Sequence, residues 1–214
     1  MNTITTRCIT EGEACYEQYV IADPAAKTEL VITPERGGMI TGFTLDGDEY
    51  IWTRRPNFSE CSRPRFAVPI LFPSCSNPDG GVHIFDGKPY PMETHGLADL
   101  CPWEVDSVGP DGVTLMLQSS PLTKFLYPFD FTLLVTYNLQ GRTATIDLTV
   151  INDGDKPMPF SFAIIPISWP ANWRMWRLTS TVPPARKTPR ANSPPHPRPS
   201  PSPAKRAPPT ASGC

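Results

Sequence analysis

The chain has 214 residues, with 19 Lys and Arg against 21 Asp and Glu, and this balance argues against a nucleic-acid-binding protein. No apolar run approaches the roughly 20 residues that a membrane-spanning helix needs, and the first residues lack the features of a signal peptide. The six cysteines are scattered, without a C-x-x-C pair or histidines at metal-ligand spacing. We therefore expect reduced thiols without a disulfide framework, a cytoplasmic location, and neither a membrane nor a nucleic-acid partner.

The near-neutral average conceals two different regions. All 21 acidic residues lie in residues 1–155, whereas residues 156–214 hold nine Lys and Arg and no acid. Eleven of the 28 prolines lie between Pro183 and Cys214, and large apolar residues are almost absent there. Such a segment cannot bury enough surface to offset its ordering entropy. The composition excludes one uniform globular domain and predicts a disordered Pro-rich tail with polyproline II character.

Short β-strands are expected wherever apolar or alternating segments are bounded by turn residues, in chain order at 30–32, 39–45, 49–52, 113–117, 131–137 and 143–150. The last segment alternates strictly between apolar and polar residues, which is typical of a half-buried strand in an antiparallel sheet. Gly141 supplies a tight turn before it. No segment keeps a 3.6-residue apolar period, so helix is expected to be scarce. The sequence predicts an all-β protein, a sandwich or a barrel.

His95 is the first candidate site residue, because the glycine that follows it leaves room for a ligand beside the ring. A neutral imidazole can donate to or accept from sugar hydroxyls, although a plain loop or core histidine remains the alternative. His83 alternates with apolar neighbours and is interpreted as a strand residue that faces solvent.

Arg65 is the second candidate, since it opens an apolar run that prolines interrupt at 69 and 73. A guanidinium held at the end of a buried strand suits hydroxyl, carboxylate or phosphate recognition. The alternative is an ion pair with a nearby acid. Cys75 has no histidine or basic neighbour in the sequence to lower its pKa, so a thiolate nucleophile is not expected there.

Four segments in order, PERGGMI (34–40), RFAVPILFP (65–73), HGLA with PWEV (95–105) and VINDGDKPMPF (150–160), resemble the bacterial aldose 1-epimerase family, which is galactose mutarotase-like. The resemblance covers residues 10–162, about the N-terminal half of that family's fold. It implies an antiparallel β-sandwich of the galactose mutarotase-like supersandwich type, incomplete in this chain and followed by the tail at 163–214. It also implies a sugar in an open cleft, with no metal and no organic cofactor.

The resemblance further implies that Arg65 and His95 hold a hexose or hexose-phosphate substrate, with His95 also part of the catalytic site. A second histidine, in a His-Pro-Tyr-Phe motif just after residue 160, would be the general acid, and a glutamate nearer the C-terminus the general base. Residues 163–170 read AIIPISWP at that place instead. We therefore expect an aldose 1-epimerase-type isomerase fold that lacks activity. A non-catalytic carbohydrate-binding remnant and a Pro-rich adaptor are the alternatives.

The missing motif is available in an adjacent reading frame. Codons for residues 163–170, read from each third base, are compatible with His-His-Pro-Tyr-Phe-Leu-Ala. A tail rich in Pro, Arg, Ala and Ser is also what an out-of-frame translation of a GC-rich gene yields. We interpret residues 163–214 as an out-of-frame extension.

This interpretation predicts the sequence of the gene. Shifting the frame by one nucleotide near Phe162 should restore His-His-Pro-Tyr-Phe and open a longer β-rich reading frame that contains an acidic base. DNA sequencing through this region tests it, and an early stop in the shifted frame without a family-like continuation would refute it.

Overall fold

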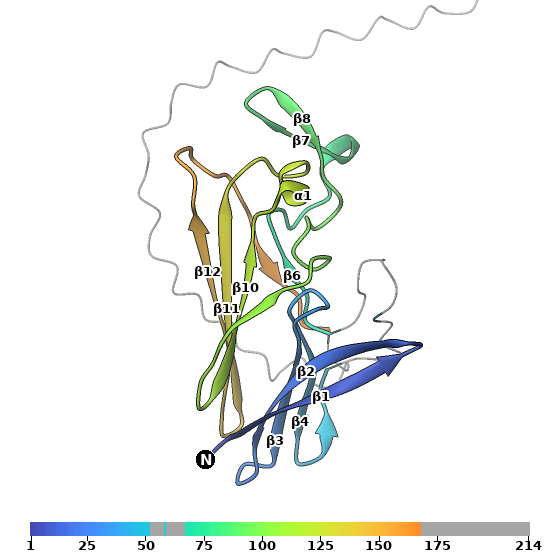
Figure 1. Ribbon diagram of the computed structural model, residues 1–214, viewed down its shortest axis with the longest axis vertical. Helices are drawn as coiled ribbons and strands as arrows, with labels where there is room; N and C mark the ends of the chain where they lie inside the picture. The colour runs from blue at the N-terminus through green and yellow to red at the C-terminus, as the bar shows by residue number, and fades with distance from the viewer. Residues whose placement is uncertain (52–57, 59–66, 168–214) are drawn as a thin grey trace, which may run out of the picture. The chain divides into compact units, whose positions relative to one another are not determined.

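The computed structural model describes residues 1–51, 58 and 67–167. Arg65 and residues 168–214 of the expected tail lie outside the described residues. Strands dominate the described part (Figure 1): β1 (Thr3–Glu11), β2 (Ala14–Asp23), β3 (Thr28–Thr33), β4 (Met39–Leu45), β5 (Asp48–Glu49), β6 (Ile70–Leu71), β7 (Val82–Phe85), β8 (Lys88–Pro91), β9 (Glu104–Val108), β10 (Gly112–Gln118), β11 (Phe131–Gln140), β12 (Thr143–Asn152) and β13 (Ala163–Ile164). The described helices are single turns, η1 (Asp79–Gly81) and α1 (Pro121–Lys124).

The strands form two larger and two smaller antiparallel sheets. The first sheet has the order β1-β2-β3-β4-β5, and the second has the order β12-β11-β10-β9. The smaller sheets pair β13 with β6 and β7 with β8. This architecture confirms the antiparallel all-β sandwich of the galactose mutarotase-like type that the sequence predicted.

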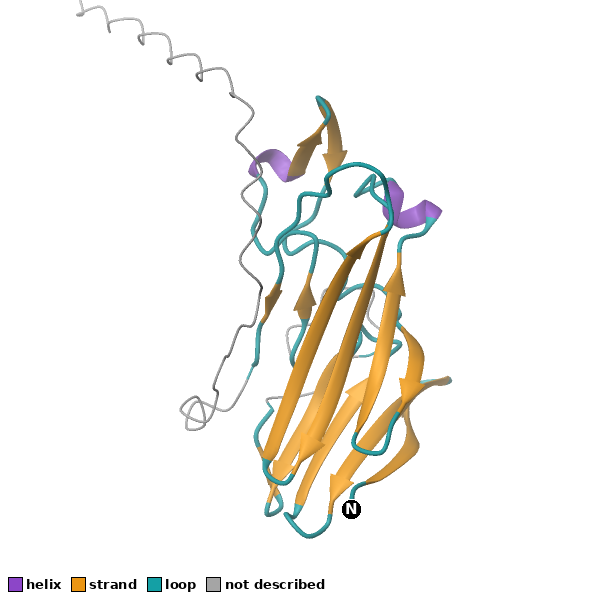
Figure 2. Ribbon diagram, turned by 90° about the vertical axis from the view of Figure 1, so that its left-hand side faces the viewer, coloured by secondary structure: helices purple, strands orange, loops and turns teal. Residues whose placement is uncertain are grey.

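Figures 1 and 2 show how the strands of the two larger sheets are arranged. Side chains from both sheets contribute to one apolar core. Alternate residues of strands such as β11 and β12 point inward, as the period of two requires. The inward side chains of β11 are almost fully buried, and so are those of β3 that face them across the core. Burying a side chain such as Leu133 or Ile32 stabilises the fold by about 1.5–3 kcal/mol before entropic costs.

The predicted strands at 39–45, 113–117, 131–137 and 143–150 coincide with β4, β10, β11 and β12, which extend up to three residues further. β5 comprises only Asp48–Glu49, and Trp52 lies outside the described residues. The N-terminal hairpin of β1 and β2 was not predicted. At the C-terminal end, β13 continues the pairing past residue 162, where the domain was expected to end.

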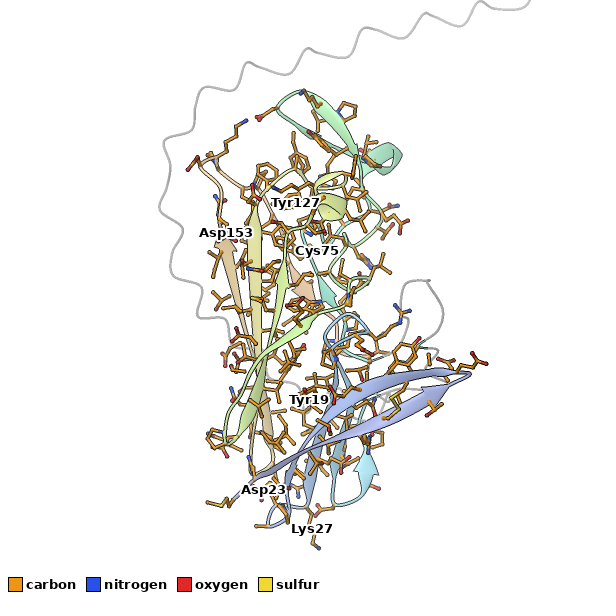
Figure 3. All side chains as sticks on the ribbon, viewed as in Figure 1. Tyr19, Asp23, Lys27, Cys75, Tyr127 and Asp153 are labelled. Carbon is orange, nitrogen blue, oxygen red and sulfur yellow. A yellow bond between two sulfur atoms is a disulfide. The ribbon has the colours of Figure 1, made fainter. Side chains whose placement is uncertain are left out.

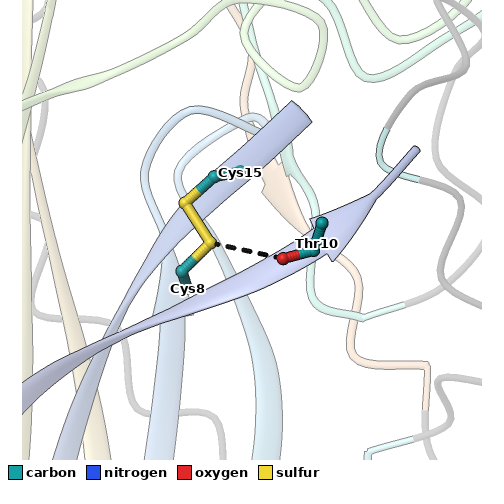
Figure 4. Close-up of a disulfide and its surroundings, with 3 residues drawn as sticks. All are labelled: Cys8, Thr10 and Cys15. Atoms are coloured by element: carbon teal, nitrogen blue, oxygen red, sulfur yellow. Dashed lines mark hydrogen bonds between the residues drawn. A yellow bond between two sulfur atoms is a disulfide. The ribbon is translucent and has the colours of Figure 1, made fainter. Parts of the chain in front are cut away.

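The expectation of reduced cysteines is wrong for Cys8 and Cys15, which form a disulfide across the β1–β2 hairpin (Figure 4). In the antiparallel register Cys8 lies opposite Glu17 and Cys15 opposite Thr10, so the two cysteines are diagonal neighbours on one face. Their Cα atoms are 5.6 Å apart, within the range that a disulfide spans. Cys75 and Cys101 are free thiols.

Tyr137 joins the two larger sheets. Its phenol lies at the centre of β11, 1% exposed, and its hydroxyl donates to the backbone carbonyl of Gly38 in the turn between β3 and β4. Gly38 lies directly under the indole of Trp103, where a Cβ atom would come within 2.9 Å of the ring. A buried carbonyl that loses its donor costs more than an average hydrogen bond contributes.

Replacing Tyr137 with Phe should lower the free energy of unfolding by about 1–3 kcal/mol, because the Gly38 carbonyl stays buried without its donor. Urea unfolding at neutral pH measures this. Thr145→Ala, an exposed change on β12, is the matched control and should alter stability by less than about 0.5 kcal/mol.

The buried phenol of Tyr137 also predicts how the stability of the fold changes at alkaline pH. Burial raises the pKa of Tyr137 above its ordinary value, and burial also raises the pKa of Tyr127. Because the unfolded phenols ionise near pH ~10, this stability is complete below that pH and is lost as pH rises beyond it. The loss should be smaller in Tyr137→Phe than in the parent protein. An equal alkaline loss in both would contradict this.

Candidate functional site

A cleft of about 910 Å³ opens beside the short β6–β13 pair. Its lining combines apolar side chains with a few polar ones: Pro69, Leu71, Asn77, Gly81, Pro91, Met92, Glu93, Thr94, His95, Asp99, Leu126, Ile165 and Ile167. Such a mixture of packing surface and convergent polar groups is typical of a small-molecule site.

A tight turn sets His95 at this cleft. His95 and Gly96 both have left-handed backbone angles, φ 72° and 82°, and the His95 N–H donates to the Ser76 carbonyl over 3.2 Å. Only glycine fits at position 96, because a Cβ atom there would overlap the Phe72 carbonyl oxygen. The His–Gly pair that singled out this histidine in the sequence is therefore a requirement of the turn. The side chain of His95 is half-buried.

The carbonyl of Phe72 anchors the segment that follows His95. It accepts hydrogen bonds from Leu97 N over 2.8 Å and from Ala98 N over 3.1 Å. The indole of Trp103 adds a third hydrogen bond, in which its Nε1 donates to the Ala98 carbonyl over 3.0 Å. The cleft residues at 95–99 are thus held by the core.

The polar groups beside His95 come from two loops. Thr94 Oγ1 donates to Asn77 Oδ1 over 2.8 Å, and this bond fixes the amide of Asn77 at the cleft. Glu93 is exposed, whereas Asp99 is 1% exposed. Burial raises the pKa of the neighbouring Cys101 thiol, and the Asp99 carboxylate adds to this. These amide, hydroxyl, imidazole and carboxylate groups can exchange hydrogen bonds with a polyhydroxylated ligand.

The opposite wall of the cleft is the segment 161–167. It runs antiparallel to residues 67–73, with Ser161 N donating to Pro73 O over 2.8 Å and Ile165 N to Pro69 O over 3.2 Å. Ile167 N donates to Ala67 O over 3.0 Å at the other end. Since side chains alternate along this extended segment, Ile165 and Ile167 point to the same side and line the cleft.

Aromatic residues hold the chain in place just before this wall begins. The hydroxyl of Tyr127 donates to the Pro159 carbonyl over 2.9 Å (Figure 3 labels Tyr127). The rings of Tyr127 and Phe160 each pack against Phe72, with centroids 5.7 and 5.6 Å apart. The chain is thereby directed from β12 back to the cleft.

This sandwich and cleft were compared with known proteins. The sequence model of the aldose 1-epimerase family matches residues 17–166. The chain belongs to the aldose 1-epimerase family.

Several solved structures are similar to this aldose 1-epimerase-family chain. The Slr1438 protein from Synechocystis sp. PCC 6803 is 31% identical, with a TM-score of 0.68 over 74% of this chain and 56% of that protein. A galactose mutarotase related enzyme from Lactobacillus acidophilus is 25% identical, with a TM-score of 0.62 over 70% of this chain and 48% of that enzyme. Protein LacX of Lactococcus lactis subsp. lactis is 27% identical over 131 residues, 42% of its length. The chain spans about half the length of these relatives.

The structure brings some of the expected residues to the cleft and not others. His95 lines the cleft, while Arg65 lies outside the described residues. His83 is on β7 as predicted but is half-buried rather than solvent-facing, with its ring stacked on Phe85. Cys75 is exposed, and its Sγ lies 3.4 Å from Ser161 Oγ.

The sequence did not predict Asn77, Glu93 and Asp99 as cleft residues. Glu93 could have been found from its place two residues before His95. Asp99 and Asn77 reach the cleft only because the loops fold back on Phe72 and Ser76.

Within the described residues, no group of three His, Cys, Asp or Glu side chains is placed to hold a metal ion. The described helices are also too short to cross a membrane.

Proposed function

We propose that the cleft binds an aldohexose as an aldose 1-epimerase-type site, and that this chain binds the sugar without interconverting its anomers. His95 would exchange hydrogen bonds with the sugar hydroxyls, with Arg65 as a second ligand from the resemblance. The observation that carries the proposal is the cleft wall, where Ile165 and Ile167 face the cavity at the place in the chain where the resemblance implies a His-Pro-Tyr-Phe motif.

The proposed inactivity follows from what mutarotation requires. A proton must leave the anomeric hydroxyl and another must reach the ring oxygen, so two titratable groups act on opposite sides of the sugar. Isoleucine can neither donate nor accept a proton. Ile165 and Ile167 can still pack against the C–H face of a pyranose, so the wall supports binding while it supplies no acid.

The lining supports a sugar ligand over a purely apolar one. Asn77, Thr94 and His95 offer neutral donors and acceptors, and Glu93 and Asp99 offer acceptors for hydroxyl protons. A hexose phosphate is a candidate ligand beside the free hexose. The binding experiment therefore uses a free sugar and a sugar phosphate as separate probes.

Binding should be measurable by isothermal titration of the full chain with D-galactose, D-glucose and D-glucose 6-phosphate. His95→Ala should weaken binding of the preferred sugar by about 1–3 kcal/mol, roughly 5- to 150-fold, since the hydroxyls lose their partner in a partly buried site. His83→Ala is the matched control, because His83 does not line the cleft, and it should leave affinity unchanged. Equal losses in both variants would argue against a site at His95.

Polarimetry separates binding from catalysis. The chain as it stands should not accelerate the mutarotation of glucose or galactose beyond buffer, because positioned acid–base groups contribute about 10²–10⁴ each. A gene with its frame restored near Phe162 should encode a protein that does accelerate it. Turnover by the present chain that His95→Ala abolishes would overturn the proposed inactivity and leave the binding proposal standing.

A further inference from the structure

The second sheet ends in a long strand with an open side. β12 pairs with β11 over all ten of its residues without a register shift, and no described strand pairs with its other side. The strand lies at the margin of its sheet in Figure 1. Proteins usually protect such an edge with lysine, proline or a bulge. β12 has none of these, and its single charged side chain is Asp147.

The hydrogen bonds next to this sheet show which backbone groups face the open side. Leu139 N donates to Asp111 O over 3.0 Å, so odd-numbered residues of β11 point their amides toward β10. Even-numbered residues of β11 therefore point their N–H and C=O groups toward β12. Each cross-strand pair of these two strands joins an even-numbered residue of one to an odd-numbered residue of the other, so the partners in β12 are its odd-numbered residues. The even-numbered residues of β12 point their N–H and C=O groups to the open edge.

The same even-numbered residues carry the apolar face of β12. Ala144, Ile146, Leu148 and Val150 pack against the core but are only half-buried. An added strand would pair with their backbone groups and also cover their side chains.

We propose that this edge pairs antiparallel with β12 of a second copy of the chain, centred on Leu148. The four-stranded sheets of the two copies then join into one continuous sheet around a two-fold axis. Ile146 lies opposite Val150 of the second copy, and Leu148 lies opposite its own counterpart. Aliphatic side chains thus meet aliphatic ones on the core side of the joined sheet.

Three constraints select this register. Apolar residues must stay on one face, so even-numbered residues must oppose even-numbered ones. Centring the pair on Asp147 would place two carboxylates directly opposite each other, which is destabilising. Centring it on Ile146 or Val150 would shorten the paired length. The register centred on Leu148 pairs nine of the ten residues of β12, from Ala144 to Asn152, while Asp147 lies opposite Thr149.

Charges at the two ends of β12 favour a second copy as the occupant. Arg142 immediately precedes the strand, and Asp153 and Asp155 follow it. Antiparallel pairing brings the Arg142 end of one copy to the end of the other copy that carries Asp153 and Asp155, and the two-fold axis repeats this approach of opposite charges. Arg142 is exposed and binds Asp46 through Nη1 over 2.7 Å, and a guanidinium carries further N–H donors beyond the one used there.

Sedimentation velocity of the full 214-residue chain tests the assembly. A dimer should form with rising concentration, and Arg142→Glu should weaken it at least tenfold, most clearly at low salt. Lys88→Glu makes the same charge change on β8, away from β12, and should leave the dimer intact. Matching thermal melts confirm that both variants are folded. A monomer at every concentration, or equal effects of the two variants, would overturn the proposal.

Cysteine cross-linking tests the register. In this register Thr145 of one copy opposes Ile151 of the other as an outward-facing pair without mutual hydrogen bonds, the closer kind of antiparallel pair. Mixing Thr145→Cys protein with Ile151→Cys protein under mild oxidation should give a disulfide between these positions, identified by mass spectrometry of the linked peptides. Mixing Thr145→Cys with Thr149→Cys is the control, since those positions meet only in the register centred on Asp147. A link in the control mixture alone would refute the register.

Discussion

The ring and the carbonyl of Phe72 connect the core of the sandwich to the cleft. The ring is fully buried and packs against Tyr127, Phe131 and Phe160. The carbonyl of the same residue accepts from two consecutive N–H groups just after His95. A shift of Phe72 would therefore move the histidine turn and the wall at residue 160 together. The position of the candidate site depends on core packing at this residue, since close-packed interiors transmit such shifts.

Two kinds of strand could be predicted: β11 and β12, which each have a more buried and a more solvated face, and β4, an apolar run that is buried along most of its length. β11 and β12 alternate because β11 points every second side chain into the core and β12 lies at its margin. β1 is exposed along most of its length and so carries no period. β6 and β13 have only two residues each, too few to show any period. β6 and β13 are decided by pairing with each other across a long stretch of chain, and a single sequence does not contain that information locally.

The candidate site was predictable to the extent that its chemistry is local. His95 was singled out because the glycine after it leaves room beside the ring, and the structure adds that Gly96 satisfies a backbone requirement of the turn that presents His95. Asn77 and Asp99 were not found, because only the folding of two separate loops brings them to the cleft. The disulfide between Cys8 and Cys15 was missed for a related reason. Its pairing follows from the register of a hairpin that the sequence pattern did not reveal.

In segment 161–167, the backbone makes the contacts that stabilise the fold, whereas the side chains would have to supply the groups that a mutarotase needs. Its pairing with residues 67–73 uses backbone N–H and C=O groups, which isoleucine supplies as well as histidine does. Isoleucine is moreover a favourable residue in a strand. The cleft wall can thus form with the proton-transfer motif replaced. Family membership and the polar lining of the cleft support the proposed sugar binding, whereas proton transfer depends on the side chains that the wall presents. The fold of this wall is therefore compatible with the proposed lack of activity.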